Sequence, residues 1–188
     1  MKSVLLVLAM TAMAATAAEA QTVFSFGSGP GQACYLHARF GLNPADGVKN
    51  CTLALQDALT TSDRAATYDN RGILLNQQGH FDDALSDFQR AAALRPDLGD
   101  AYINIGSILI RRKSYEEALA QIDKGMALGA SFPHVAYYDR ALALELLGRY
   151  KEAYADYKKA LEIEPNFSMA SERLKDFTVT TVPAKQAS

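Results

Sequence analysis

The chain has 188 residues, which is enough for one ordinary domain with a sizeable core but too few for two independent enzyme domains. With 49% hydrophobic and 21% charged residues, its composition is that of a globular protein and excludes wholesale disorder, a collagen-like rod and a polytopic membrane protein. Lysine and arginine total 19 against 21 acidic residues, so the net charge of -2 gives no electrostatic reason to expect nucleic acid or an anionic membrane as the partner.

The first twenty residues are typical of a secretory signal peptide. Lys2 precedes an apolar run over residues 4–18, and the small residues Ala18 and Ala20 mark a cleavage site before Gln21. The run is shorter than the roughly 20 residues needed to cross a bilayer. We therefore expect cleavage after Ala20 and a periplasmic or secreted protein that does not span the membrane; an uncleaved signal anchor is the alternative.

Export favours a disulfide between the two cysteines, Cys34 and Cys51. They lie about equally far from the centre of a turn-forming stretch at residues 41–47, so antiparallel helices joined there would bring them level. For a loop of this length the chain-entropy model gives about 3 kcal/mol of stabilisation. A redox pair is disfavoured because Cys-x-x-Cys spacing and a flanking base are absent, and two buried free thiols are the other alternative.

Internal repetition is the most informative feature of the chain. A set of aromatic, glycine, alanine and leucine positions recurs with a period of about 34 residues, the length of a two-helix repeat. The first copy is Tyr68, Gly72, Leu75, Phe81, Ala84, Phe88, Ala91 and Leu94, the second is Tyr102, Gly106, Leu109, Tyr115, Ala118, Ile122, Gly125 and Leu128, and the third is Tyr137, Ala141, Leu144, Tyr150, Ala153, Tyr157, Ala160 and Ile163. We place the extra residue before the third copy in a turn at residues 129–133.

The spacing within each copy predicts two amphipathic helices, because apolar residues recur at intervals of three and four. Small residues let the helix backbones approach closely, and larger side chains fill the space between them. The filling positions are Phe88, Ile122 and Tyr157, and the turns between helices are expected at Gly79, Lys113 and Gly148. A hairpin of this kind leaves one face uncovered, and stacking of successive hairpins buries it.

This pattern resembles the tetratricopeptide repeat (TPR) family over about residues 65–167. Tyr stands in place of the usual Trp, and Arg71 and Arg140 stand where Leu is usual. The resemblance implies an all-α, right-handed solenoid of antiparallel helix hairpins, with units at 65–98, 99–133 and 134–167 and a concave side formed by the first helices. At the two arginines we expect intramolecular salt bridges, to Asp87 and Asp156 on the second helices, rather than ligand contacts.

Both ends of the solenoid need covers. Residues 32–64 are interpreted as a degenerate N-terminal hairpin, with a short helix over about 32–39 and an apolar helical face after it that consists of Val48, Cys51, Leu55, Ala58 and Leu59. Residues 168–177 are predicted to form a capping helix. Residues 21–31 are expected to be a flexible lead and residues 178–188 a disordered tail.

Local motifs for catalysis or metal binding are absent from the sequence. The three histidines, His37, His80 and His134, lack metal-ligand spacing. The glycine-rich stretch at 27–31 has no Lys-Ser or Lys-Thr after it, and no serine-nucleophile signature is present. We therefore expect no metal, no cofactor and no enzymatic activity.

The resemblance instead implies a peptide-binding concave face. It would consist of Asp69, Asn70, Ile73, Asn76 and Gln77 from the first unit, Asp100, Ile103, Asn104, Ser107, Ile110 and Arg111 from the second, and Val135, Tyr138, Asp139, Leu142 and Glu145 from the third. Asn70 and Asn104 could hold the backbone of an extended peptide, since a carboxamide both donates and accepts hydrogen bonds. The alternative is that these polar residues only solvate the groove. The face lacks the Lys and Arg cluster with which family members hold a C-terminal carboxylate.

The sequence as a whole therefore predicts a non-catalytic scaffold of the cell envelope that binds a protein or peptide, as a monomer or weak homo-oligomer, without nucleic acid or a small-molecule cofactor. Two alternatives stay open. One is an accessory subunit or enzyme that acts on cell-envelope material, and the other is a self-associating structural protein.

Overall fold

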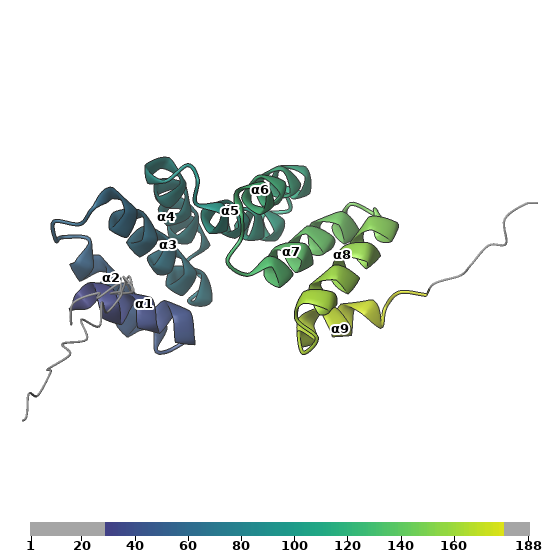
Figure 1. The fold of residues 1–188 in the computed structure, drawn as a ribbon, viewed down its shortest axis with the longest axis horizontal. Coiled ribbons are helices and arrows are strands. Elements are labelled where there is room, and N and C mark those ends of the chain that lie inside the picture. The colour runs from purple at the N-terminus through teal and green to yellow at the C-terminus, as the bar shows by residue number, and fades with distance from the viewer. Residues whose placement is uncertain (1–28, 179–188) are drawn as a thin grey trace, which may run out of the picture.

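The computed structural model describes residues 29–178, so the predicted signal peptide, most of the predicted lead and nearly all of the predicted tail lie outside it. Within that range the chain forms helices and no strand (Figure 1). The helices are α1 (Pro30–Phe40), α2 (Pro44–Ala54), α3 (Thr61–Gln77), α4 (Phe81–Leu94), α5 (Gly99–Arg111), α6 (Tyr115–Leu128), α7 (Pro133–Leu146), α8 (Tyr150–Ile163) and α9 (Ser168–Leu174).

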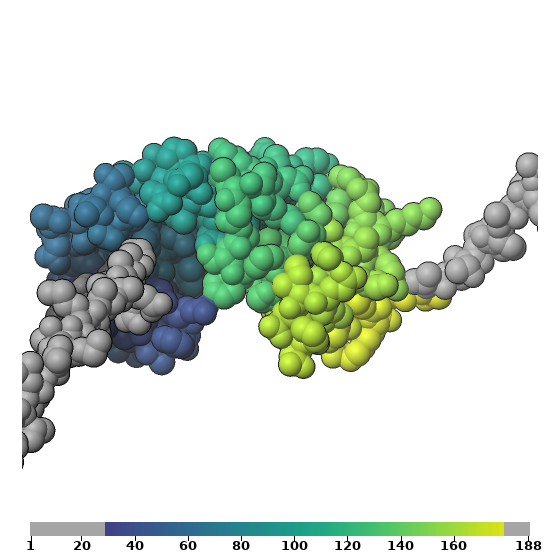
Figure 2. Space-filling model, viewed as in Figure 1, coloured from purple at the N-terminus to yellow at the C-terminus, as the bar shows by residue number. Residues whose placement is uncertain are grey.

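The helices form a curved stack of antiparallel hairpins. The pairs α1 and α2, α3 and α4, α5 and α6, and α7 and α8 each pack together, and each pair packs against the next (Figure 1). In the space-filling view the stack is an arc, hollowed on the side that lies between α1 and α2 at one end and α8 and α9 at the other (Figure 2). The predicted all-α solenoid is thus confirmed.

The predicted turns within the hairpins adopt left-handed backbone conformations. Gly79 has φ 82° and Gly148 has φ 76°, values that glycine adopts without a steric penalty. Lys113 occupies the same turn position with φ 64°, although it carries a side chain. The chain therefore reverses at the three positions that the repeat alignment indicates.

Close approach of the helices depends on the small residues of the repeat. A Cβ atom at Gly72 would lie 2.5 Å from Cε1 of Phe88, so no larger residue fits there while the ring stays in place. The predicted filling residues are almost fully enclosed, with Phe88 at 1% exposure and Ile122 and Tyr157 at 0%. Such packing is what excludes water from between the helices.

The two predicted salt bridges connect first and second helices. Arg71 donates from Nε and Nη2 to the two carboxylate oxygens of Asp87, at 2.6 and 2.9 Å. Arg140 binds Asp156 in the same way, at 2.7 and 2.9 Å. The hydrogen bonds from Arg71 to Asp87 raise the pKa of its guanidinium, as expected for a charge held by a partner.

The N-terminal hairpin differs in extent from its sequence interpretation. Helix α1 already begins at Pro30, within the predicted lead, because proline is well suited to the first turn of a helix. Helix α2 ends at Ala54, so Ala58 and Leu59 lie in the connection to α3 rather than on a helical face. Arg64 stabilises this connection by donating to the backbone oxygens of Leu55 and Asp57, at 3.0 and 3.1 Å.

A disulfide joins Cys34 of α1 to Cys51 of α2. Both cysteines are buried, and they form a small apolar cluster with Leu74 of α3. The disulfide therefore links the two helices of the N-terminal hairpin, and the hairpin packs on the first repeat. At the opposite end, α9 stops at Leu174, three residues before the end of the predicted cap, and Phe177 beyond it packs against Tyr154 and Tyr157.

Candidate peptide-binding site

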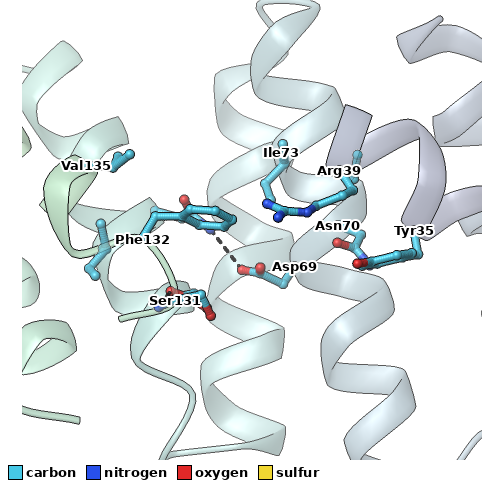
Figure 3. Close-up of a pocket in the computed structure, with 12 residues that line it drawn as sticks. Tyr35, Arg39, Asp69, Asn70, Ile73, Ser131, Phe132 and Val135 are labelled. Carbon is cyan, nitrogen blue, oxygen red and sulfur yellow. Dashed lines mark hydrogen bonds between the residues drawn. The ribbon is translucent and has the colours of Figure 1, made fainter. Parts of the chain in front are cut away.

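The inner side of the arc contains a cavity of about 560 Å³. Four helices and the turn before the last of them contribute its walls (Figure 3). The lining residues are Tyr35, Ala38 and Arg39 of α1, Asp69, Asn70 and Ile73 of α3, Asp100, Ile103 and Asn104 of α5, Ser131 and Phe132 of the α6–α7 turn, and Val135 of α7. On each of α1, α3 and α5 the three residues recur at helical spacing, so that each helix turns one stripe toward the cavity.

Asp69 is the most enclosed charged group of the cavity, with 9% of its surface exposed. Its Oδ1 atom accepts a hydrogen bond from Nδ2 of Asn104 at 3.0 Å, drawn as a dashed line in Figure 3. Burial raises the pKa of the Asp69 carboxyl from 3.8 to about 7, the Asn104 hydrogen bond opposes the rise, and the negative charge of Asp100 adds to it. Within residues 29–178 no cation forms an ion pair with Asp69.

Asp100 fixes the turn that forms one rim of the cavity. Its carboxylate accepts hydrogen bonds from the backbone N–H of Ser131, at 2.8 Å, and from the Ser131 hydroxyl. Phe132, the next residue, is 43% exposed. The Arg39 guanidinium of α1 lies over the Phe132 ring, 4.7 Å from its centroid. The N-terminal hairpin and the α6–α7 turn thus meet across the mouth of the cavity.

The structure brings part of the predicted concave face together. The predicted residues that line the cavity are Asp69, Asn70, Ile73, Asp100, Ile103, Asn104 and Val135. The others lie on α3, α5 and α7 outside it, and they are Asn76, Gln77, Ser107, Ile110, Arg111, Tyr138, Asp139, Leu142 and Glu145.

Several of the outlying residues already have partners within the protein. Ile110 is 8% exposed and belongs to the apolar core. Glu145 accepts a hydrogen bond from the Tyr157 hydroxyl at 2.8 Å and pairs with Arg173 at 3.1 Å. Burial raises the pKa of Asp139 to about 7, and the positive charge of Arg111 opposes the rise. These residues of the predicted face, which lie outside the cavity, therefore contribute contacts within the solenoid.

The sequence did not indicate the contributions of α1 and of the α6–α7 turn. Tyr35, Ala38 and Arg39 precede the first recognisable repeat, and Ser131 and Phe132 lie in a turn whose length differs between repeats. The only available signal was the 3-4 spacing of the α1 residues, which also fits an ordinary solvated face.

Between residues 29 and 178 no group of three or more His, Cys, Asp or Glu side chains is arranged to hold a metal ion. The same part of the chain contains no helix with the length and apolar character of a membrane span.

A stack of two-helix hairpins with an inner groove defines a helical repeat protein. Two family models, both described as tetratricopeptide repeat, match residues 70–133 and 134–167, together more than half of the chain. The chain belongs to the tetratricopeptide repeat family.

The chain is similar to several known proteins. The DnaJ homolog subfamily C member 7 homolog of Schizosaccharomyces pombe is 30% identical over 110 residues, which are 56% of this chain and only 23% of that protein. The first TPR of Spaghetti (RPAP3), bound to the HSP90 peptide SRMEEVD, is 28% identical with a TM-score of 0.56, covering 61% of this chain and 90% of that one. MamA is 25% identical with a TM-score of 0.57, covering 82% and 78% of the two chains.

Proposed function

We propose that the protein is a non-catalytic scaffold of the cell envelope that binds an extended segment of a protein partner in its inner cavity. The observation that carries this proposal is the cavity itself, built by α1, α3 and α5 and open to solvent on the concave side. Concave faces of repeat solenoids serve as extended binding surfaces. TPR proteins are typically non-enzymatic interaction modules, and a similar TPR holds a peptide.

The polar groups of the cavity suit a peptide backbone. The Asn70 side chain forms no hydrogen bond with any residue of the described range, although it lines the cavity. Asn104 uses one N–H on Asp69 and keeps its carbonyl oxygen for a ligand. Each amide can therefore pair with a backbone N–H or C=O of a bound segment, while Ile73, Ile103 and Val135 contact its side chains.

Envelope location is part of the proposal. It is supported by the signal-like pattern of residues 1–20 and by the disulfide between Cys34 and Cys51, because disulfides persist in oxidising compartments. Mass spectrometry of the protein from the exported fraction of its native cells should find an N-terminus at Gln21. Recovery of the chain only in the cytosolic fraction, with Met1 retained, would contradict this location.

Photo-crosslinking in the native cells tests the binding site. Replacing Tyr35, which lines the cavity and is 39% exposed, with p-benzoylphenylalanine preserves an aromatic side chain and should give a discrete adduct with a partner protein. The same replacement at Tyr150 is the matched control, because Tyr150 is 61% exposed but lies on α8 outside the cavity. No protein adduct at Tyr35, or the same adducts at both positions, would reject the cavity as the binding site.

A further inference from the structure

We infer that the inner cavity selects a positively charged side chain, lysine or arginine, of the bound segment. This inference rests on the proposed function and adds the charge of the ligand to it. It is carried by the arrangement of carboxylates, aromatic rings and apolar walls around the cavity.

Two carboxylates from neighbouring helices line the cavity without a cation between them. Asp69 of α3 and Asp100 of α5 are close enough for the charge of Asp100 to act on Asp69. Neither forms an ion pair within residues 29–178, and Asp69 accepts a single hydrogen bond, from a neutral amide. Because an enclosed carboxylate is poorly solvated, it gains more from an incoming cation than an exposed one does.

The rim of the cavity already holds a guanidinium group. Arg39 lies over the ring of Phe132 at 4.7 Å from the centroid, and the two side chains approach from opposite walls in Figure 3. The protein's own arginine therefore shows that the ring face is open to a cation at this place. Arg39 is exposed and forms no ion pair in the described part of the chain, so a ligand's cation competes only with its contact to the Phe132 ring.

The remaining walls fit the stem of a long basic side chain. Ile73, Ile103 and Val135 are apolar and lie beside the carboxylates, so the methylene groups of a lysine or arginine can be buried while its charged end reaches Asp69. The cavity of about 560 Å³ exceeds a single side chain and accommodates flanking backbone as well. An acidic segment such as SRMEEVD, the ligand of the similar TPR, would instead place its carboxylates beside Asp69 and Asp100.

The test begins with selection of random twelve-residue peptides on the oxidised protein. Isothermal titration then compares an enriched peptide with copies in which each Lys or Arg is replaced by Gln or by Glu. We expect one basic position at which Gln weakens binding at least tenfold and Glu weakens it further. The weakening with added salt should also decrease in the Gln copy, because one charge pair is lost.

Variants of the protein place the charge selection in the cavity. Asp69→Asn keeps the size of the side chain and should weaken the basic peptide about tenfold, while Asp176→Asn, an exposed carboxylate beyond α9, is the matched control and should have no effect. Arg39→Gln removes a competing cation at an exposed position and should strengthen the basic peptide about threefold to tenfold. An anion-binding cavity would show the opposite response to Arg39→Gln.

The outcomes separate the two proposals. Equal binding of the Lys or Arg peptide and its Gln copies, or enrichment of acidic peptides, would overturn the charge selection and leave peptide binding intact. Failure to enrich any peptide that competes for the cavity would overturn both. A loss with Asp69→Asn and a gain with Arg39→Gln, in proteins with unchanged circular dichroism, would support the inference.

Discussion

At the scale of single residues, Asp69 is the most informative group of the molecule. It lies on a helix face that the repeat alignment turns toward the groove, yet it is buried and forms no ion pair with any residue between 29 and 178. A carboxyl in such a place is stabilised by neither solvent nor an ion pair, which is why its pKa rises to about 7. The ionised form of Asp69 therefore lowers the stability of the folded protein, and a ligand that carries a cation would offset this loss.

This loss predicts the pH dependence of stability. The folded-state pKa of Asp69, about 7, lies above the ordinary value of 3.8, so the folded chain binds an extra proton between these pH values. The contribution of Asp69 is therefore most favourable below about pH 4 and is lost as the pH rises through 7. Asp69→Asn should be more stable than the wild type at pH 8 by about 1 to 3 kcal/mol in urea unfolding.

The difference between Asp69→Asn and the wild type should shrink as the pH falls toward 5. Asp139 has a similarly raised pKa and keeps part of the pH dependence in the variant. Asp176→Asn serves again as the control and should leave the unfolding curve unchanged at both pH values. A variant less stable than the wild type at pH 8 would show that ionised Asp69 is stabilised by a partner in the folded protein, contrary to this prediction.

At the scale of the helices, the repeat pattern predicted most of the structure because it is local. Helix starts and ends within residues 65–167 follow from the apolar spacing and from the turns at Gly79, Lys113 and Gly148. The end of α2 could not be predicted in the same way. The connection from α2 to α3 depends on hydrogen bonds from Arg64 to backbone oxygens, and such bonds leave no periodic pattern in the sequence.

The candidate site could be predicted only where it follows the repeat. Asn70 and Asn104 occupy equivalent positions, and both line the cavity. Arg39 and Phe132 come from segments far apart in sequence, and their contact depends on how strongly the stack curves. Curvature is the sum of small rotations between hairpins, which the sequence does not specify residue by residue.

The salt bridge between Arg71 of α3 and Asp87 of α4 is the contact between helices that is best suited to a quantitative test. Asp87 is 1% exposed, so Arg71→Leu would leave a buried carboxylate with only Arg90, at 3.3 Å, to compensate it. We expect a loss of about 3 kcal/mol in the free energy of unfolding, measured by urea denaturation. Adding Asp87→Ala should restore much of it, because the uncompensated charge is then gone.

The exposed ion pair between Arg149 and Glu152 provides the comparison for the buried salt bridge. Arg149 and Glu152 have side chains that are 47% and 56% exposed, so Arg149→Leu should leave the free energy of unfolding almost unchanged. If the Arg71→Leu and Asp87→Ala double variant proved no more stable than Arg71→Leu alone, the buried charge would not be the origin of the loss.

At the scale of the whole molecule, the N-terminal hairpin connects stability to binding. It packs on Leu74 of the first repeat, and its helix α1 provides the wall of the cavity that contains Tyr35, Ala38 and Arg39. Helix α1 is held by packing on α2 and α3 and by the bond from Cys34 to Cys51. The disulfide therefore preserves the shape of the site in a segment that has few apolar contacts of its own.

Removing the disulfide should open the site before it unfolds the protein. In a variant with Cys34→Ser and Cys51→Ser, the loss of a closed loop of this size is worth about 3 kcal/mol in the entropy model. Two hydroxyls would also replace sulfur in the cluster around Leu74. Hydrogen exchange should therefore accelerate in α1 and α2 while α5 to α8 stay protected, because unfolding can be local in a repeat stack.

Peptide binding gives a second measurement of the effect of removing the disulfide. A peptide selected on the oxidised protein should bind the double serine variant at least tenfold more weakly, since one wall of its cavity is no longer fixed. Reducing agent should weaken binding to the wild type in the same direction and leave the variant unaffected. Full protection of α1 in the variant, together with unchanged peptide affinity, would show that packing on α3 alone positions α1, and the disulfide would then have no part in shaping the site.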